Sequence, residues 1–224
     1  MSHLRSITFL LCVLLASSAI QAAPATRPAE RKLPHLQVNV AKHQVRVECE
    51  AINPEEKLEF LVCATGTKEY ESVLRSRARP SHLHFALLML GLAPGQPVKF
   101  NEVQNEWIPP RGPALKLSCE FVREGKTIVI PASRLMRSVK DKSAMPDVQW
   151  VFVGAPTLED GEYAADVTGY LITVVNFEHT VIDIPQLRSS KNDSLEWEIN
   201  PEVMPKRNTP VWLIVEPAEE RKKN

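Results

Sequence analysis

The segment of residues 58–95 constrains the fold of this chain more than any other stretch. It reads LEFLVCATGTKEYESVLRSRARPSHLHFALLMLGLAPG. Two apolar runs separated by a polar, Gly-containing turn predict strands at Leu58–Ala64 and Glu71–Arg75. Consecutive elements joined by short connections lie side by side. We therefore expect the two strands to pack next to each other, with the turn at Gly66 sending the chain back beside the first strand.

A helix is predicted for His82–Leu90, directly after the second strand. Ser81 is a favourable N-cap, and Gly91 followed by Pro94 is a typical stop signal. Apolar side chains cover nearly the whole circumference of this helix, and such helices are usually buried. We therefore expect it to lie inside the core.

The rest of the chain is a series of short extended segments with Pro-containing turns between them. The 18 Pro and 8 Gly residues fit many short strands and argue against Gly-rich phosphate loops. The pattern predicts an α+β fold: a mainly antiparallel β-sheet with one buried helix (about 82–90) and a short second helix allowed at Ala132–Val139. Further strands are predicted at Leu36–Val40, Gln44–Cys49, Val98–Asn101, Ala114–Arg123, Lys126–Pro131, Val148–Val153, Thr168–Asn176, Ser194–Ile199 and Pro210–Glu216.

The N-terminus predicts export. Arg5 precedes the apolar run Ile7–Ala16, which is too short to span a bilayer, and Ala22 offers a cleavage site. An uncleaved signal anchor is the alternative. We expect a signal peptide (1–22), a flexible leader (23–34), a single domain (35–217) and a charged tail (218–224). The mature protein would be periplasmic, cell-envelope bound or secreted, with no transmembrane segment after the signal peptide.

Composition and motifs exclude several classes of function. The 27 Lys and Arg residues balance the 27 Asp and Glu residues, so nothing favours nucleic acid as a partner. The sequence contains no H-E-x-x-H, G-x-S-x-G, P-loop, G-x-G-x-x-G or C-x-x-C motif. A conventional enzyme is therefore disfavoured.

Three cysteines remain after the signal peptide: Cys49, Cys63 and Cys119. If residues 50–57 connect a hairpin, Cys49 and Cys63 sit near the facing strand ends and could form a disulfide. Alternatively, all three are buried thiols that behave as small apolar residues. Both interpretations stay open.

One surface carries most of the candidate chemistry. Cys63, Lys68, Glu69, Glu71 and His84 are predicted to meet around one groove, because short connections keep their elements adjacent. Lys68, Glu69, Glu71 and His84 would contact a ligand or partner. Cys63 and His84 would be metal ligands, which favour zinc or copper. The alternative is that the carboxylates are solvated, the thiol is packed and His84 satisfies a backbone carbonyl.

The order of these motifs resembles the YdjY-type domain of exported bacterial proteins, notably of planctomycetes. The runs EFLVCATGTKEYES, RPSHLHFALLMLGLAPG, WVFVGA, YLITVVNFEHTVIDIP and TPVWLIVEP carry the similarity over about residues 36–217. The resemblance implies export and the extent of the domain, and it implies no particular activity. The turn of the family typically reads Gly-Thr-Lys-Glu-His-Glu, whereas this chain has Tyr70 at the histidine position.

Two functions are therefore predicted. The first is an exported, non-catalytic domain that binds a protein or a small ligand through the surface around residues 63–84. The second is a metal-binding or redox domain that uses Cys63, His84 and the Glu69/Glu71 pair, with Cys49 as a possible fourth contributor.

Overall fold

The computed structural model describes residues 33–218. In this part of the chain strands occupy 39% and helical segments 13%, so the fold is mostly β. The α-helices are α1 (Pro80–Met89) and α2 (Ala164–Thr168), and the 3₁₀ segments are η1 (Glu69–Glu71), η2 (Ala132–Leu135) and η3 (Asn192–Ser194). The strands are β1 (Leu36–Asn39), β2 (Gln44–Ala51), β3 (Phe60–Ala64), β4 (Ser72–Ser76), β5 (Lys99–Asn101), β6 (Glu106–Ile108), β7 (Ala114–Arg123), β8 (Lys126–Pro131), β9 (Met136–Ser138), β10 (Trp150–Phe152), β11 (Tyr170–Thr173), β12 (Ile182–Asp183), β13 (Trp197–Ile199) and β14 (Pro210–Pro217).

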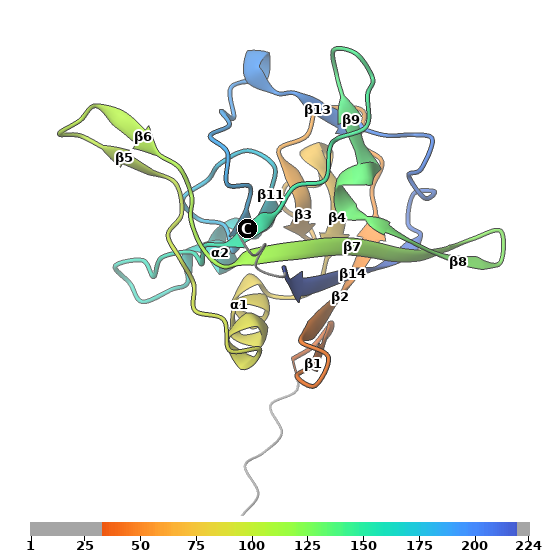
Figure 1. The fold of residues 1–224 in the computed structure, drawn as a ribbon, viewed down its shortest axis with the longest axis horizontal. Coiled ribbons are helices and arrows are strands. Elements are labelled where there is room, and N and C mark those ends of the chain that lie inside the picture. The colour runs from red at the N-terminus through yellow and green to blue at the C-terminus, as the bar shows by residue number, and fades with distance from the viewer. Residues whose placement is uncertain (1–32, 219–224) are drawn as a thin grey trace, which may run out of the picture. The chain divides into compact units, whose positions relative to one another are not determined.

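A closed barrel organises the described residues (Figure 1). Its eight strands follow the order β2, β14, β7, β10, β12, β11, β3 and β4, and β4 returns to β2 through the pairs Glu50–Arg75 and Ala51–Leu74. The predicted α+β fold with an antiparallel sheet is therefore wrong. Alternating apolar residues look the same in an open sheet and in a barrel, and closure depends on a pairing between distant strands that the pattern does not reveal.

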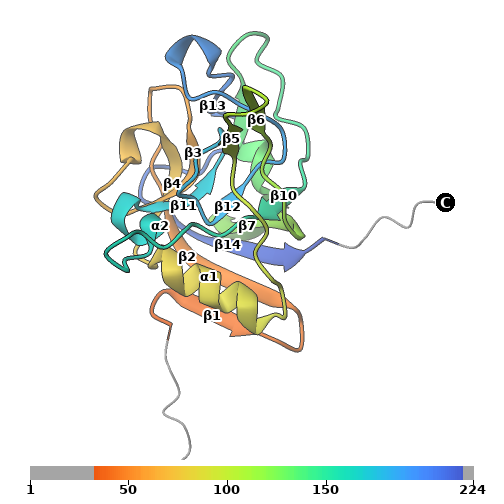
Figure 2. The ribbon, with the colours of Figure 1, turned by 90° about the vertical axis from the view of Figure 1, so that its left-hand side faces the viewer.

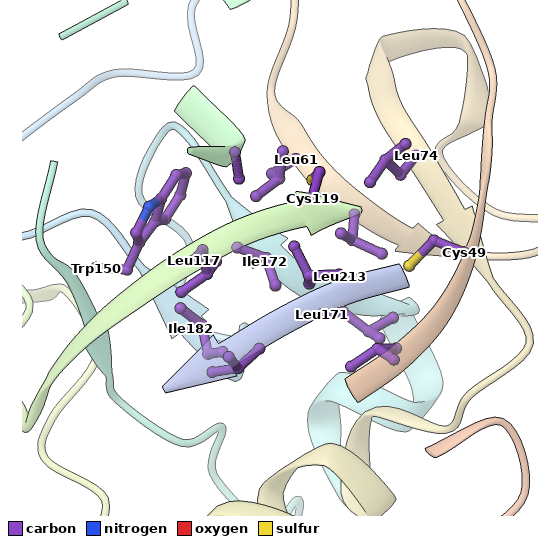
Figure 3. Packing of buried hydrophobic residues seen from close by; sticks show 14 of the residues in the cluster. Cys49, Leu61, Leu74, Leu117, Cys119, Trp150, Leu171, Ile172, Ile182 and Leu213 are labelled. Atoms are coloured by element: carbon purple, nitrogen blue, oxygen red, sulfur yellow. The ribbon is translucent and has the colours of Figure 1, made fainter. Parts of the chain in front are cut away.

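Side chains fill the barrel interior (Figure 3). Alternate residues of β2 and β7 are buried, including Cys49, Leu117 and Cys119, and β14 buries Val211 and Leu213–Val215. On the opposite wall, Ile172 of β11 points toward the same interior. A barrel of this size has an interior just wide enough to be filled by its own side chains. The described core is therefore continuous and apolar.

Strands β3 and β4 pair in parallel, with Phe60 opposite Ser72 and Cys63 opposite Arg75. The predicted antiparallel return after Gly66 is therefore wrong. Residues 65–71 run back along the barrel wall before β4 begins. As a result, Glu71 lies beside Glu59, whose N–H donates to the Glu71 carbonyl at 3.0 Å.

The predicted disulfide does not form. Cys49, Cys63 and Cys119 are all free and buried. The hairpin expected between β2 and β3 is absent from the described fold, because β4 pairs with both of these strands and separates them. Two strand spacings are about 10 Å, beyond the roughly 7 Å limit between the Cα atoms of a disulfide.

Helix α1 lies along β1 and β2 (Figure 2) and contacts β11 and α2 as well. Its inner residues Leu83, Ala86 and Leu87 are buried. An outer face made of Phe85, Leu88 and Met89 is exposed, so the expectation of burial on all sides is wrong. Composition alone could not indicate which side of an apolar helix the sheet would cover.

The N-terminus of α1 is capped from another element. The predicted N-cap, Ser81, lies inside the first turn, and the helix begins at Pro80. Asp166 of α2 accepts hydrogen bonds from the Ser81 N–H at 2.8 Å and the Ser81 hydroxyl at 2.6 Å. Asp166 also pairs with Arg79 at 2.7 Å. A carboxylate at this position satisfies free N–H groups and complements the helix dipole.

The remaining predictions differ in detail. The second helix at Ala132–Val139 is the 3₁₀ segment η2 followed by β9. Strands β5 and β6 form a hairpin that projects from the barrel (Figure 1). No helix in residues 33–218 is long and apolar enough to cross a membrane. The predicted signal peptide, and most of the leader and tail, lie outside the described residues.

Candidate functional site

Glu69 stabilises the turn that precedes β4. Its Oε1 accepts a hydrogen bond from the Gly66 N–H at 2.8 Å, and its Oε2 pairs with Arg75 Nη1 at 2.8 Å. Burial opposes ionisation of Glu69, but the Gly66 N–H and the Arg75 guanidinium outweigh it and lower the pKa of this carboxyl. Both oxygens have partners within the fold, so Glu69 has a structural role.

Glu59 and Glu71 form a pair of neighbouring acids. The Glu59 residue is only 8% exposed, and the carboxylate of the half-buried Glu71 acts on it from the neighbouring turn. Burial and, after it, the adjacent Glu71 carboxylate raise the pKa of Glu59 to about 7, although Lys68 opposes the shift. Glu59 therefore titrates near neutral pH, which an exposed glutamate does not do.

Lys68 contacts both Glu71 and Tyr70. Lys68 Nζ lies 3.1 Å from Glu71 Oε1 and donates a hydrogen bond to the Tyr70 hydroxyl at 3.0 Å. The bond to Tyr70, followed by the contact with Glu71, raises the pKa of Lys68, so its ammonium stays charged. No well-directed hydrogen bond within residues 33–218 reaches Glu71 Oε1, although this atom is buried. Its charge is balanced by the Lys68 ammonium, 3.1 Å away.

A groove of about 590 Å³ opens beside this pair. We call it the acid-pair groove; it is lined by Glu56, Lys57, Tyr70, Glu71, Asn192 and Leu195. Tyr70 is 57% exposed at its edge. Lys57 Nζ donates to the Asn192 carbonyl at 3.0 Å and connects the two sides. The acid pair is thus accessible to a ligand through Glu71.

His84 has different neighbours. Its Nδ1 lies 2.7 Å from the Tyr163 hydroxyl, which accepts a hydrogen bond from the Ala155 N–H at 3.0 Å. With the Ala155 N–H bound to the Tyr163 oxygen, the Tyr163 proton is free to be donated to Nδ1 of a neutral His84. Burial lowers the pKa of His84, in agreement with this arrangement. The ring also packs edge-on against Phe152, with centroids 5.0 Å apart.

A comparison with known families identifies the domain. A family model described as the YdjY domain matches residues 36–216. The chain belongs to the YdjY domain family. The match begins with the first residue of β1 and ends within β14, so the YdjY domain includes all eight strands of the barrel. A search of curated proteins and a search of solved structures each found no match.

The structure brings together only part of the predicted surface of the YdjY domain. Lys68, Glu69 and Glu71 are neighbours in and beside η1. Cys63 lies behind this turn; it is buried, and burial raises the pKa of its thiol. His84 makes its side-chain contacts with Tyr163 and Phe152 instead. The side-chain contacts of the five residues therefore do not join them into one site.

The described residues of the YdjY domain offer no ligand set for zinc or copper. Within residues 33–218, no group of three or more His, Cys, Asp or Glu side chains is arranged to hold a metal ion. Burial also raises the pKa of Cys49, and that of Cys119 to about 12, which disfavours the thiolate that binds metal. The predicted pair of Cys63 and His84 gains no third partner.

Sequence reasoning missed Glu59, the neighbour of Glu71 whose pKa is raised in the YdjY domain. A signal was present, since Glu59 is an acidic residue inside the apolar run LEFLVC. A carboxylate in a strand with both faces buried must find a partner or hold a proton. The partner was not predictable, because it depends on the parallel pairing of β3 and β4.

Proposed function

We propose that this YdjY domain is an exported, non-catalytic binding domain whose ligand contacts the acid-pair groove. The observation that carries the proposal is the buried Glu59 paired with Glu71, which lines a groove with an exposed Tyr70 at its edge. Strongly shifted pKa values cluster at functional sites. The apolar run Ile7–Ala16 and the small residues at 22 and 23 support export.

The groove chemistry favours a ligand that donates hydrogen bonds and carries positive charge, such as an arginine side chain of a partner protein. With Lys68 charged, Glu59, Glu71 and Lys68 sum to zero charge when Glu59 holds its proton and to −1 when it does not. A cation therefore prefers the ionised pair, and the Tyr70 ring offers a face for a cation–π contact. The Glu71 carboxylate, which lines the groove, supplies a charged acceptor for the donor.

Other features support binding over nucleophilic catalysis or redox chemistry. The thiols of Cys49, Cys63 and Cys119 are buried with raised pKa values, so their nucleophilic thiolate form is disfavoured. The Nδ1 of His84 is occupied by Tyr163. With no metal ligand set in residues 33–218, we propose no metal or redox function.

The proposal is tested by calorimetric titration of the folded domain with a blocked, arginine-containing pentapeptide. Glu71→Gln should weaken binding about tenfold or more, because a charge-assisted hydrogen bond is lost. Affinity should fall when the pH is lowered from 8 to 5.5, since Glu59 takes up a proton near pH 7. In Glu59→Gln this pH dependence should disappear.

Glu55→Gln is the matched control, because Glu55 is an exposed carboxylate on the same connection and does not line the groove. Its affinity for the peptide should equal that of the wild type. Binding that is unchanged in Glu71→Gln, or that responds equally to Glu55→Gln, would contradict the proposal. Melting temperatures of all variants establish that the fold is intact.

A further inference from the structure

A second groove lies between the projecting β5–β6 hairpin and the segment 187–191. Its volume is about 500 Å³, and we call it the aromatic groove. One wall is apolar and consists of Val98, Trp107 and Leu187. Trp107 is 53% exposed and packs against Phe100 across the hairpin, with ring centroids 5.2 Å apart. The hairpin projects from the barrel (Figure 1), and the packed rings of Phe100 and Trp107 form a large aromatic surface on it.

The opposite wall of the aromatic groove is cationic. Arg188 and Lys191 line it, and none of the described residues that line it is a carboxylate. Arg188 Nε lies 3.5 Å from Glu196 Oε2. This single contact through Nε leaves the two terminal nitrogens of the guanidinium available to an anion. The groove therefore combines an apolar surface with a cationic wall, where Glu196 offsets only part of the positive charge.

The cationic wall is anchored to the barrel. Asn176 Oδ1 accepts a hydrogen bond from the Arg188 N–H at 2.7 Å, and the Asn176 N–H donates to the Arg188 carbonyl at 3.1 Å. The Asn176 amide also donates to the buried Asp183 Oδ1 at 3.2 Å. The backbone of Arg188 is thus held by a chain of hydrogen bonds from β12, and Glu196 Oε2 lies 3.5 Å from its guanidinium. A restrained cation loses less conformational freedom on binding.

We propose that the aromatic groove binds an acidic segment of a partner protein. Carboxylates of that segment pair with Arg188 and Lys191, and an apolar side chain packs on Trp107. The positive charges of Arg188 and Lys191 favour a negatively charged segment. The apolar wall favours a segment that carries apolar residues as well. Trp and Arg are the residue types that most often dominate binding energy at protein interfaces. This site shares no lining residue with the acid-pair groove and does not depend on the function proposed for it.

The test is a fluorescence and calorimetric titration of the folded domain with a blocked heptapeptide of alternating glutamate and leucine. Trp107→Ala should weaken binding at least tenfold, and so should the double variant Arg188→Glu/Lys191→Glu. Wild-type affinity should fall as salt is raised from 50 to 500 mM, because the ion pairs are screened. A peptide with lysine in place of glutamate should not bind this groove.

Lys99→Glu and Tyr70→Ala are matched controls. Phe100 pairs with Trp107 across the hairpin, so the adjacent Lys99 faces the opposite side. Tyr70 lines the other groove. Both variants should bind the acidic peptide within twofold of the wild type, and unchanged circular dichroism and melting temperature establish that each variant is folded.

Three outcomes would overturn the proposal. The first is no binding of the acidic peptide at millimolar concentration, and the second is affinity that is unchanged in the Trp107 and Arg188/Lys191 variants. The third is binding of polygalacturonate with no binding of the acidic peptide, which would assign the groove to an anionic polysaccharide. Loss of arginine-peptide binding in Glu71→Gln, tested separately, leaves this result unaffected and distinguishes the two grooves.

Discussion

Asp183 is a buried carboxyl group outside both grooves. Its Oδ1 accepts hydrogen bonds from the Ile184 N–H at 2.8 Å and the Thr173 hydroxyl at 3.0 Å, in addition to Asn176. Its Oδ2 has no partner within residues 33–218. Burial raises the pKa of Asp183 to about 8, although these donors oppose the shift. In the folded protein, Asp183 is therefore mostly protonated and uncharged at neutral pH.

Asp183→Asn should remove a pH-dependent loss of stability. The folded state keeps the proton up to about pH 8, whereas the unfolded chain releases it near pH 4. The contribution of Asp183 to the unfolding free energy of the wild type is therefore greatest below pH 4. It declines as the pH rises to 8, by at most about 1.4 kcal/mol per pH unit. Urea unfolding of both proteins at pH 5, 6, 7 and 8 measures the difference.

As the pH rises through this range, the unfolding free energy of Asp183→Asn should increase relative to that of the wild type. Glu55→Gln, which changes an exposed carboxylate, should follow the wild-type curve. A constant difference between Asp183→Asn and the wild type from pH 5 to pH 8 would mean that Asp183 is ionised in the folded protein.

At the scale of elements, α1 shows how one helix can be half core and half surface. Its inner residues pack on the barrel and on α2, while Phe85, Leu88 and Met89 remain exposed. Asp166 fixes the start of the helix by bonding Ser81, so α1 and α2 position each other. The helix depends on tertiary contacts, as short helices generally do.

Leu87→Ala should cost about 2–5 kcal/mol of unfolding free energy, because a fully buried leucine leaves a cavity when truncated. Leu88→Ala is the matched control one position further along the same helix; Leu88 is 41% exposed and its truncation should cost less than about 1 kcal/mol. Chemical denaturation measures both values. Equal losses in the two variants would contradict the assignment of the inner and outer faces.

At the scale of the whole molecule, barrel closure depends on a short seam. Only two residue pairs join β2 to β4 in the described structure. Arg75 reinforces this seam, because its Nη2 lies 2.8 Å from Glu50 Oε2 on β2 while its Nη1 holds Glu69. Closure removes the exposed edges at which open sheets pair with other chains. A closed barrel with two side grooves is a suitable scaffold for the binding function proposed above.

The barrel strands all lie within residues 44–217, so cleavage after Ala22 would remove none of them. We therefore expect the protein isolated from the cell envelope or medium to begin near Ala23. N-terminal sequencing or intact-mass measurement checks this. A folded protein that retains Met1 in those fractions would contradict the proposed processing.

Local patterns determined much of the secondary structure. Strands β7 and β8 match the predicted Ala114–Arg123 and Lys126–Pro131, because alternating apolar residues flank a two-residue turn at Glu124–Gly125. Both turn residues have positive φ, of 51° and 74°, as a tight hairpin requires. The polar turn with Lys68, Glu69 and Glu71 was also recognised from the sequence, as was the YdjY domain.

Tertiary structure alone decided the closure of the barrel, the parallel pairing of β3 with β4, the separation of Cys49 from Cys63 and the meeting of Glu59 with Glu71. Strand propensity and turn chemistry act between residues a few positions apart, so a single sequence displays them directly. The choice of strand neighbours instead depends on which distant apolar faces can be buried together. The same choice places a carboxyl group in water or beside another carboxyl group, and with that it sets the chemistry of the acid-pair groove.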